Sequence, residues 1–282
     1  DKMLRSFKYA TRSLHSNSAL KSTFNSHLLR NKWAIDEREK SVIVTMNTNA
    51  VNCINMEFFN DLNDTMERLE KDIPNHKPVL LTGPKESRTF SAGLDLKSLL
   101  THDTQESALK FVHQLNNAFE KWYLMKRPTV AIINGHAIAG GMILALCNDF
   151  QVFVKNDKKK LVFLKEVELG LPFPGKTFEI IKKTIPEREL WNATALAKTY
   201  DSETADKVFS HVYEGDFEGA IDYAENIFQL HSMELSIKAY CDIKSNLKRF
   251  NTSKEVLENA DKQFVDCFFQ PKVQKFIHHQ LL

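Results

Sequence analysis

Strand-forming and helix-forming segments alternate along the middle of the sequence, and this alternation limits the fold more than any other feature. Short apolar, β-branched runs predict strands at 41–46, 78–82, 129–133 and 150–154. Between them, hydrophobic residues at helical spacing predict helices at 56–71, 104–124 and 139–146. Because strands separated by helices pair in parallel, roughly 120 residues of this pattern predict an α/β fold with helices on both faces of a mainly parallel sheet.

The sequence beyond Pro174 changes to helical segments with little strand between them. These segments are 178–183, 187–197, 217–230, 234–250 and 253–269. Neither an internal repeat nor a Gly/Ser-rich linker separates them from the preceding part. The sequence therefore predicts a helical C-terminal lobe that packs on the sheet domain or on a neighbouring subunit.

The first 35 residues have a composition of their own. No acidic residue occurs from Lys2 to Ile35, where basic residues and serines are interspersed. The hydrophobic residues of this segment recur at helical spacing, with most basic ones on the opposite side: Met3, Leu4, Phe7, Ala10 and Leu14. This composition is typical of a mitochondrial transit peptide; the alternatives are a disordered basic arm and a surface helix of the mature domain.

Charge and cysteine content argue against several classes of function. With 38 Lys+Arg against 36 Asp+Glu, the formal net charge is only +2, which gives no general attraction to nucleic acid or to a membrane surface. No apolar run reaches the ~20 residues that span a bilayer, so we expect no stable membrane insertion. The cysteines form no Cys-x-x-Cys pair and stand far apart, which predicts neither a zinc site nor a disulfide framework: Cys53, Cys147, Cys241 and Cys267.

Two clusters of small residues follow predicted strands. Phe90–Leu96 follows a strand and a loop, and Asn134–Gly141 ends a strand and opens a helix, whose N-terminal amides favour negative charge. Small side chains leave backbone N–H groups accessible. An ordinary tight turn explains either cluster alone, but two such turns that converge form an oxyanion hole. Neither contains the glycine pattern of a dinucleotide site or of a phosphate loop.

Together, these two segments resemble the crotonase (enoyl-CoA hydratase/isomerase) superfamily, and Phe90–Leu96 is especially similar to its mitochondrial Δ3,Δ2-enoyl-CoA isomerases. The resemblance runs from about Val42 to Leu171 and continues more weakly to the C-terminus. It implies an α/β fold of the crotonase (ClpP-like) type, a spiral of ββα units with a helical C-terminal lobe. The implied organisation is a transit peptide or basic arm at 1–35, a crotonase-type core at 36–212 and a helical trimerisation region at 213–282.

The resemblance also assigns site residues by position. It implies oxyanion amides at Leu94 and Gly140. The family's catalytic carboxylate, marked by Glu-x-x-Leu-Gly, falls on Glu166, and we interpret Glu168, two residues on, as a solvated carboxylate. The resemblance implies that the acyl-CoA path is lined by Ala92, Gly93, Asp95, Leu96, Ala139 and Ile143.

One departure from the family pattern distinguishes among its reactions. Hydratases of the family use two glutamates, the first lying three residues after the second oxyanion glycine, where this chain has Ile143. An isoleucine cannot hydrogen-bond the water that a hydratase holds between its carboxylates. With Glu166 alone, the implied reaction is the Δ3,Δ2-enoyl-CoA isomerisation of fatty-acid β-oxidation, in which Glu166 carries a proton from C2 of a 3-enoyl-CoA to C4.

Other roles remain open: thioester hydrolysis, decarboxylation or hydration on the same fold, and a non-catalytic acyl-CoA- or RNA-binding function. The densest basic run, 155–160, includes Asp157 and is interpreted as a solvated hairpin, so we expect no nucleic-acid partner. The expected partner is the acyl-CoA substrate, which itself contains the coenzyme A; no metal or other cofactor is expected. The resemblance implies a homotrimer, and the basic arm favours the mitochondrial matrix over the peroxisome, because Gln280–Leu282 matches a Ser-Lys-Leu ending poorly.

Overall fold

A computed structural model describes residues 32–228 and 233–281. The chain divides into two units, of which the second, Trp33–Leu282, contains nearly all of the described residues. Residues 1–31 of the predicted targeting segment lie outside the described residues. Residues 33–35, which were predicted to belong to that segment, are part of the second unit, because Trp33 is buried and Ala34 begins a strand.

The described strands are β1 (Ala34–Glu37), β2 (Val42–Thr45), β3 (Cys53–Ile54), β4 (Val79–Thr82), β5 (Thr89–Ser91), β6 (Gly93–Leu94), β7 (Thr129–Ile133), β8 (His136–Ile138), β9 (Phe150–Lys155), β10 (Val162–Phe163), β11 (Thr199–Tyr200) and β12 (His211–Glu214). Within the described residues they form a six-stranded sheet in the order β1-β2-β4-β7-β9-β12, a four-stranded sheet in the order β11-β10-β8-β5, and a two-stranded pair of β3 and β6.

The six-stranded sheet confirms the mainly parallel arrangement predicted from the alternating pattern. All neighbours pair in parallel except β1, which runs antiparallel to β2 at the edge. Along β4, Val79 and Leu81 pack into one hydrophobic core and Leu80 into another. Successive side chains of a strand point to opposite faces, so both faces of this sheet are buried.

The described helices are α3 (Met56–Asp72), α4 (Leu96–Leu100), α5 (Gln105–Tyr123), α6 (Gly140–Leu146), α7 (Gly175–Thr184), α8 (Glu187–Thr194), α9 (Phe217–Ile227), α10 (Met233–Lys248), α11 (Lys254–Phe268) and α12 (Pro271–Gln280), with 3-10 turns η1 (Glu166–Leu169) and η2 (Ala205–Lys207). Within the described residues, no helix has both the length and the hydropathy to cross a membrane.

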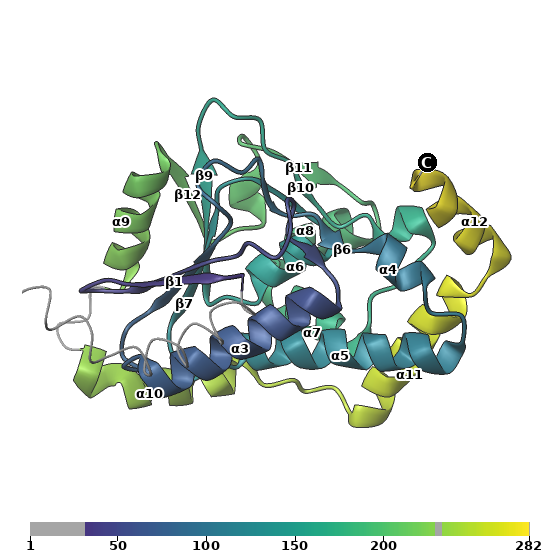
Figure 1. Cartoon of the computed structure of the whole chain (residues 1–282), viewed down its shortest axis with the longest axis horizontal. Coiled ribbons are helices and arrows are strands. Elements are labelled where there is room, and N and C mark those ends of the chain that lie inside the picture. The colour runs from purple at the N-terminus through teal and green to yellow at the C-terminus, as the bar shows by residue number, and fades with distance from the viewer. Residues whose placement is uncertain (1–31, 229–232, 282) are drawn as a thin grey trace, which may run out of the picture. The chain divides into compact units, whose positions relative to one another are not determined.

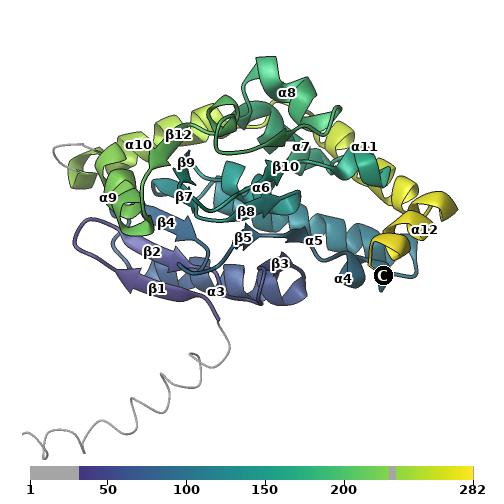
Figure 2. The same cartoon turned by 90° about the horizontal axis from the view of Figure 1, so that it is seen from above.

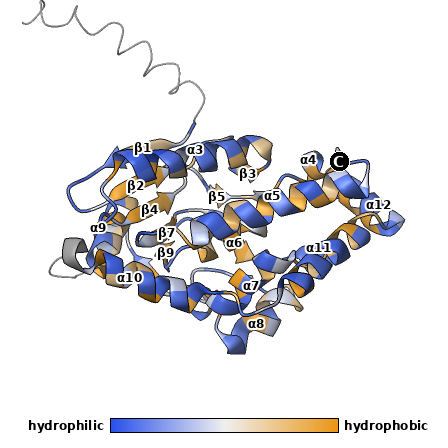
Figure 3. Ribbon diagram, turned by 90° about the horizontal axis from the view of Figure 1, so that it is seen from below, coloured by the Kyte–Doolittle hydropathy of each residue, from blue (hydrophilic) through white to orange (hydrophobic). Residues whose placement is uncertain are grey.

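Helices cover both faces of the six-stranded sheet. Helix α9 packs on β7 and β9 and contributes Ala220, Ile221 and Ala224 to the smaller core (Figure 1). The larger core lies on the other face and includes residues of α3, α5 and α6. Figure 3 shows hydrophilic and hydrophobic residues alternating around α3 and α5, as expected for helices that bury one side. This layering is the one that the alternation of strands and helices predicts.

The C-terminal part is helical, as predicted. Helix α11, which Figure 2 shows next to α12, packs against both α5 and α7. Helix α12 packs against η1. Helix α12 lies within the region 213–282 that was predicted to be helical, although no separate helix was predicted there, and of its residues only Val273 and Ile277 are buried. Through α11 and α12, the last part of the chain reaches the segment that contains Glu166.

The interpretation of 155–160 as a solvated hairpin is correct in that residues 156–159 are exposed, but wrong in that the segment is not a hairpin. The preceding strand, β9, belongs to the six-stranded sheet and the following strand, β10, to the four-stranded sheet, so the two do not pair. Lys160, moreover, is only 1% exposed, and its ammonium group lies over the ring of Phe153. The segment is a crossover between two sheets, which residue composition alone did not reveal.

Candidate active site

Three segments singled out in the sequence converge because they follow neighbouring parallel strands. In the four-stranded sheet, β5, β8 and β10 run parallel to one another. The segment Phe90–Leu96 continues from β5, Asn134–Gly141 runs through β8, and Glu166 follows shortly after β10. The carboxyl ends of parallel strands meet at one edge of a sheet, which is where ligand sites of such sheets form. Residues far apart in the sequence therefore meet at this edge.

The backbone amides of Leu94 and Gly140 lie close together. A β-carbon added to Gly140 would come within 3.3 Å of the Leu94 nitrogen, and one added to Gly93 within 2.9 Å of the Gly140 nitrogen. Gly140 is also the first residue of α6, and the first amides of a helix have no acceptor within the helix. Two N–H groups at a helix N-terminus are suited to bind an oxygen that carries negative charge.

The backbone between these amides is strained. Ala139 precedes α6 with φ 49° and ψ −119°, a conformation that residues with a side chain rarely adopt. Its N–H donates to the carbonyl oxygen of Phe163 in β10 at 2.8 Å, which fixes the turn against the strand that leads to Glu166. Strained backbone persists where the surroundings hold it, and it concentrates at binding and catalytic sites.

Glu166 as a whole is partly exposed, but its carboxylate is buried. Its Oε2 is buried and has no hydrogen-bond partner within the described part of the chain. Burial raises the pKa of Glu166 to about 8, and a hydrogen bond from its own backbone N–H opposes this shift only in part. A carboxylate that is poorly solvated is a stronger base than one in water, so Glu166 can take up and return a proton near neutral pH.

Glu168 lies on the same turn in a different environment. Its side chain is 53% exposed, and its Oε1 lies 3.4 Å from the Nζ of Lys165. This agrees with the interpretation of Glu168 as a solvated carboxylate, although the residue also borders the cavity next to Glu166. The two glutamates therefore differ in solvation, which is the property that controls their strength as bases.

A cavity of about 300 Å³ brings most of the predicted site residues together. The predicted residues that line it come from three segments of the chain: Ala92, Leu94, Leu96, Ala139, Gly140, Ile143 and Glu166. The wall is largely apolar, and Ile143 is only 3% exposed. The cavity therefore places one buried carboxylate and two neighbouring amides in apolar surroundings.

Two residues predicted to line the acyl-CoA path do not border this cavity. Gly93 is buried behind it with φ 77°, and a β-carbon there would lie 2.4 Å from the carbonyl oxygen of Ile138. Asp95 instead caps α4, because its Oδ1 accepts from the backbone N–H groups of Lys97 and Ser98. Gly93 thus allows the two amides to approach each other, and Asp95 orders the helix that follows.

Many residues around the cavity were not found from the sequence. They come mainly from helices and strands that pack over the converging segments: Ile54, Leu115, Phe119, Ile138, Phe163, Lys165, Leu169, Leu171, Thr177, Phe264, Phe276 and Gln280. Leu115 and Phe119 lie four residues apart on the buried side of α5. Nothing in that spacing separates a residue that lines a cavity from one that fills a core.

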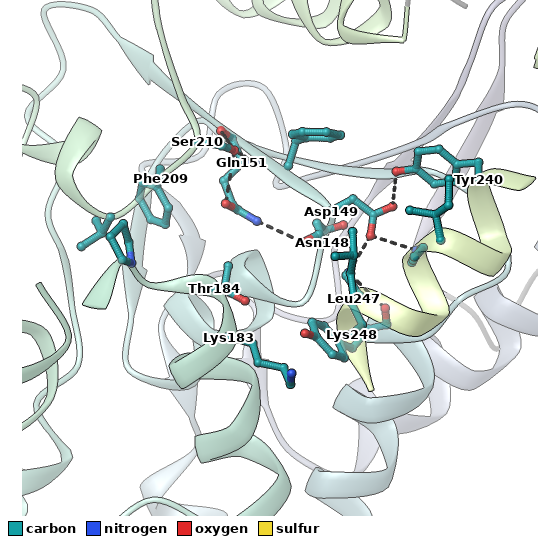
Figure 4. A pocket seen from close by; sticks show the side chains of 16 residues that line it. Asn148, Asp149, Gln151, Lys183, Thr184, Phe209, Ser210, Tyr240, Leu247 and Lys248 are labelled. Carbon is teal, nitrogen blue, oxygen red and sulfur yellow. Dashed lines mark hydrogen bonds and ion pairs between the residues drawn. The ribbon is translucent and has the colours of Figure 1, made fainter. Parts of the chain in front are cut away.

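A larger pocket of about 620 Å³ lies elsewhere and is lined in part by α10 (Figure 4). Asp149 is its central group, with Lys248 Nζ at 2.6 Å and Lys244 Nζ at 3.0 Å from Oδ1. Burial alone would raise the pKa of Asp149, but the two ammonium groups hold it below its ordinary value. Lys248 also donates to two backbone carbonyl oxygens and Lys244 to one. These charges fasten α10 to the core, and none of the predicted site residues lines this pocket.

This anchor gives a stability prediction for Tyr240→Phe. The Tyr240 hydroxyl donates to Asp149 Oδ2 at 2.8 Å. Hydrogen bonds to charged groups contribute about 1.5–3 kcal/mol, so we expect the free energy of unfolding to fall by about that amount in urea titrations. Tyr223→Phe is the matched control, because the Tyr223 hydroxyl contacts His211 on a more exposed surface. Equal effects of the two substitutions would contradict the anchoring role.

The chain matches the family model described as "Enoyl-CoA hydratase/isomerase" over residues 37–212. It is 26% identical to enoyl-CoA delta isomerase 1, mitochondrial, of Mus musculus, over 95% of this chain and 94% of that protein. It is also 32% identical to enoyl-CoA delta isomerase 2, peroxisomal, of Arabidopsis thaliana, over 38% of this chain and 45% of that protein.

A solved structure of methylmalonyl-CoA decarboxylase with 2-nitronate-propionyl-CoA has the same fold. It superposes with a TM-score of 0.74 at 15% identity, over 88% of this chain and 95% of that chain. At this identity the likeness concerns the fold alone. The fold predicted from the resemblance, a crotonase-type α/β core with a helical C-terminal region, is confirmed.

Proposed function

Because the chain belongs to the enoyl-CoA hydratase/isomerase family, we propose that it is a Δ3,Δ2-enoyl-CoA isomerase. It moves the double bond of a 3-enoyl-CoA to the trans-2 position. The observation that carries the proposal is a single buried carboxylate, Glu166, in an apolar cavity that also contains the two neighbouring amides of Leu94 and Gly140.

The reaction needs one base and one oxyanion site. The Glu166 carboxylate removes a proton from C2 of the 3-enoyl thioester, and the electron pair moves onto the thioester oxygen as the enolate forms. The N–H groups of Leu94 and Gly140 donate hydrogen bonds to that oxygen. The enolate then collapses, C4 takes the proton back from Glu166, and the double bond lies between C2 and C3. Protons and electrons balance without any other reactant.

Ile143 favours isomerisation over hydration. A hydratase must position a water molecule, whereas Ile143 offers only a buried apolar surface to the cavity. Glu168 is the remaining carboxylate at the cavity, but it is half-exposed and paired with Lys165. The buried part of the cavity around Ile143 therefore offers no second carboxylate to hold the water that hydration requires.

Two substrates distinguish isomerisation from hydration. Purified protein is incubated separately with trans-3-hexenoyl-CoA and trans-2-hexenoyl-CoA, and the products are identified by mass and by absorbance of the conjugated thioester. We expect the 3-enoyl substrate to give the 2-enoyl isomer at unchanged mass. Rapid water addition to the 2-enoyl substrate would instead make the protein a hydratase. Release of free coenzyme A thiol would indicate a thioesterase. A decarboxylase would change neither substrate, because neither carries a carboxylate to lose.

The raised pKa of Glu166 predicts the pH dependence of the reaction. Only the ionised carboxylate accepts a proton from C2, and burial raises its pKa to about 8. Activity, measured as kcat/KM for the free enzyme, should therefore rise with pH and level off above about pH 8. The residual activity of Glu166→Gln should lack this rise. A wild-type profile already level at pH 6 would contradict a buried, unpaired base.

Compartment and assembly form part of the same proposal. The basic composition of residues 1–35 supports the mitochondrial matrix. A fusion of these residues to a fluorescent protein should be found in mitochondria, whereas import of the full chain into peroxisomes would favour the alternative.

We further propose that the chain forms a homotrimer through the helical region at 213–282. Light scattering measures the mass of the assembly and so tests the number of subunits. Coenzyme A enters as part of the substrate, and the proposed chemistry requires no other cofactor.

A further inference from the structure

Three helices close the inner end of the cavity. Helices α5, α7 and α11 pack against one another in all three pairings. A buried polar network joins them at this point: Asp261 Oδ1 of α11 accepts from the side-chain amide of Asn116 in α5 and from the backbone N–H of Gly175 in α7, each at 2.8 Å. Asn116 Oδ1 accepts in turn from the Thr177 hydroxyl at 2.9 Å. These contacts fix the helices at this end of the cavity.

The cavity wall on this side consists of buried side chains. Leu115 and Phe119 come from α5, Thr177 from α7 and Phe264 from α11, and each is at most 6% exposed. Of the other lining residues, Glu168, Phe276 and Gln280 are exposed. The cavity is therefore open to solvent where α12 and η1 border it, and closed where the buried side chains of α5, α7 and α11 form its wall. We call Leu115, Phe119, Thr177 and Phe264 the floor.

We infer that the floor limits the acyl chain of the substrate to short and medium length, at about eight carbons. The inference rests on the proposed function, because it places the thioester at the amides of Leu94 and Gly140. A cavity of about 300 Å³ holds on the order of ten groups the size of a water molecule, at roughly 30 Å³ each. An octanoyl thioester has that many non-hydrogen atoms, counting its oxygen and sulfur.

The packed floor makes the limit sharp. Below the limit, each additional methylene buries apolar surface and should increase the affinity about fourfold. Above it, the tail meets close-packed side chains of three helices that the Asp261 network fixes in place, and overfilling such a site is unfavourable. Longer chains must then bend back toward the exposed side, without the gain that burial provides.

The test measures the affinity of saturated acyl-CoAs, which need no turnover. Butanoyl-, hexanoyl-, octanoyl-, decanoyl-, dodecanoyl- and hexadecanoyl-CoA are titrated calorimetrically. We expect about a fourfold gain per methylene up to octanoyl-CoA and no further gain, or a loss, from decanoyl-CoA onward. A steady gain through hexadecanoyl-CoA would overturn the length limit but leave the proposed isomerase intact. Absence of binding at every length would overturn both.

Two matched variants of α5 locate the limit. Phe119→Ala removes a ring from the floor and should move the break in the series to longer chains. Phe111→Ala removes the same ring from a site on the same helix that is also buried but does not border the cavity, and it should leave the break unchanged. An unmoved break in Phe119→Ala, or equal shifts in both variants, would overturn the role of the floor. The wild-type titrations alone show at which chain length the affinity stops increasing, so the length limit stays testable even if one of the variants does not fold.

Discussion

Replacing Glu166 with glutamine is expected to lower isomerase activity by about 10³- to 10⁴-fold, near the upper end of what a positioned acid–base group contributes. The side-chain amide of glutamine cannot accept the proton from C2. The backbone N–H groups of Leu94 and Gly140 remain and can still stabilise the enolate, which accounts for the residual activity. The side chain keeps its size, so substrate affinity should change little. The measurement is kcat for trans-3-hexenoyl-CoA at pH 8.5, where the wild-type carboxylate is largely ionised.

Glu168→Gln is the matched control for this substitution. It makes the same chemical change two residues away, on a side chain that is half-exposed and paired with Lys165. We expect it to retain most of the wild-type kcat. A Glu168→Gln variant as inactive as Glu166→Gln would show that the cavity uses two carboxylates and would return hydration to consideration.

Unfolding does not explain the expected loss in Glu166→Gln. Because burial raises the pKa of Glu166 in the folded protein to about 8, the folded state holds the proton more tightly than the unfolded state does. The contribution of this group to stability is therefore full below the unfolded pKa and decreases as the pH rises toward 8. Glutamine does not ionise, so the variant does not lose this stability as the pH rises. It should be at least as stable as the wild type at pH 8.5, and urea titrations measure this.

Replacing Gly93 with alanine is the second substitution with a large expected effect. The added β-carbon would lie 2.4 Å from the Ile138 carbonyl oxygen and 2.9 Å from the Gly140 nitrogen, and φ at this position is 77°. Both neighbours are backbone atoms, so the chain that carries the two oxyanion amides must move. Loss of one oxyanion donor costs about 10²- to 10³-fold in kcat, and we expect a decrease of this size.

Gly83→Ala is the control for the effect of a glycine substitution as such. Gly83 has no positive φ, and the nearest atom to an added β-carbon is the Thr89 carbonyl oxygen at 3.1 Å, a contact that small adjustments relieve. It should keep kcat within a few-fold of the wild type. Near-normal kcat in a folded Gly93→Ala would mean that the two amides do not act on the reacting oxygen.

Most of the large elements could be predicted from the sequence, because their patterns are local. The strand Thr129–Ile133 was predicted with its observed bounds, and the helix predicted at 104–124 is observed as Gln105–Tyr123. The short strands β8 and β10 were missed, since two or three residues do not show a periodic pattern. Yet these strands bring the three segments of the site together.

The chemistry of the site could be predicted only where it depends on local sequence. Small residues in the sequence predict the turns around Leu94 and Gly140, and the family pattern identifies Glu166. Helix α12, which packs against the turn that carries Glu166, comes from the far end of the chain. For the same reason, the floor residue Phe264 could not be assigned to the cavity from its position in a helix. The capping role of Asp95 was not predicted, because a capping aspartate and a pocket aspartate look alike in sequence; its contact with the acyl-CoA stays a prediction.

The transfer of a proton from C2 to C4 by one carboxylate can be measured directly. Trans-3-hexenoyl-CoA carrying two deuterium atoms at C2 is converted by the wild-type protein in ordinary water, and the mass of the 2-enoyl product is determined at early times. A buried Glu166 that returns the proton it removed predicts a product that carries two deuterium atoms, one at C2 and one at C4. A product with one deuterium atom throughout, or one that has gained water, would contradict a single-carboxylate isomerase.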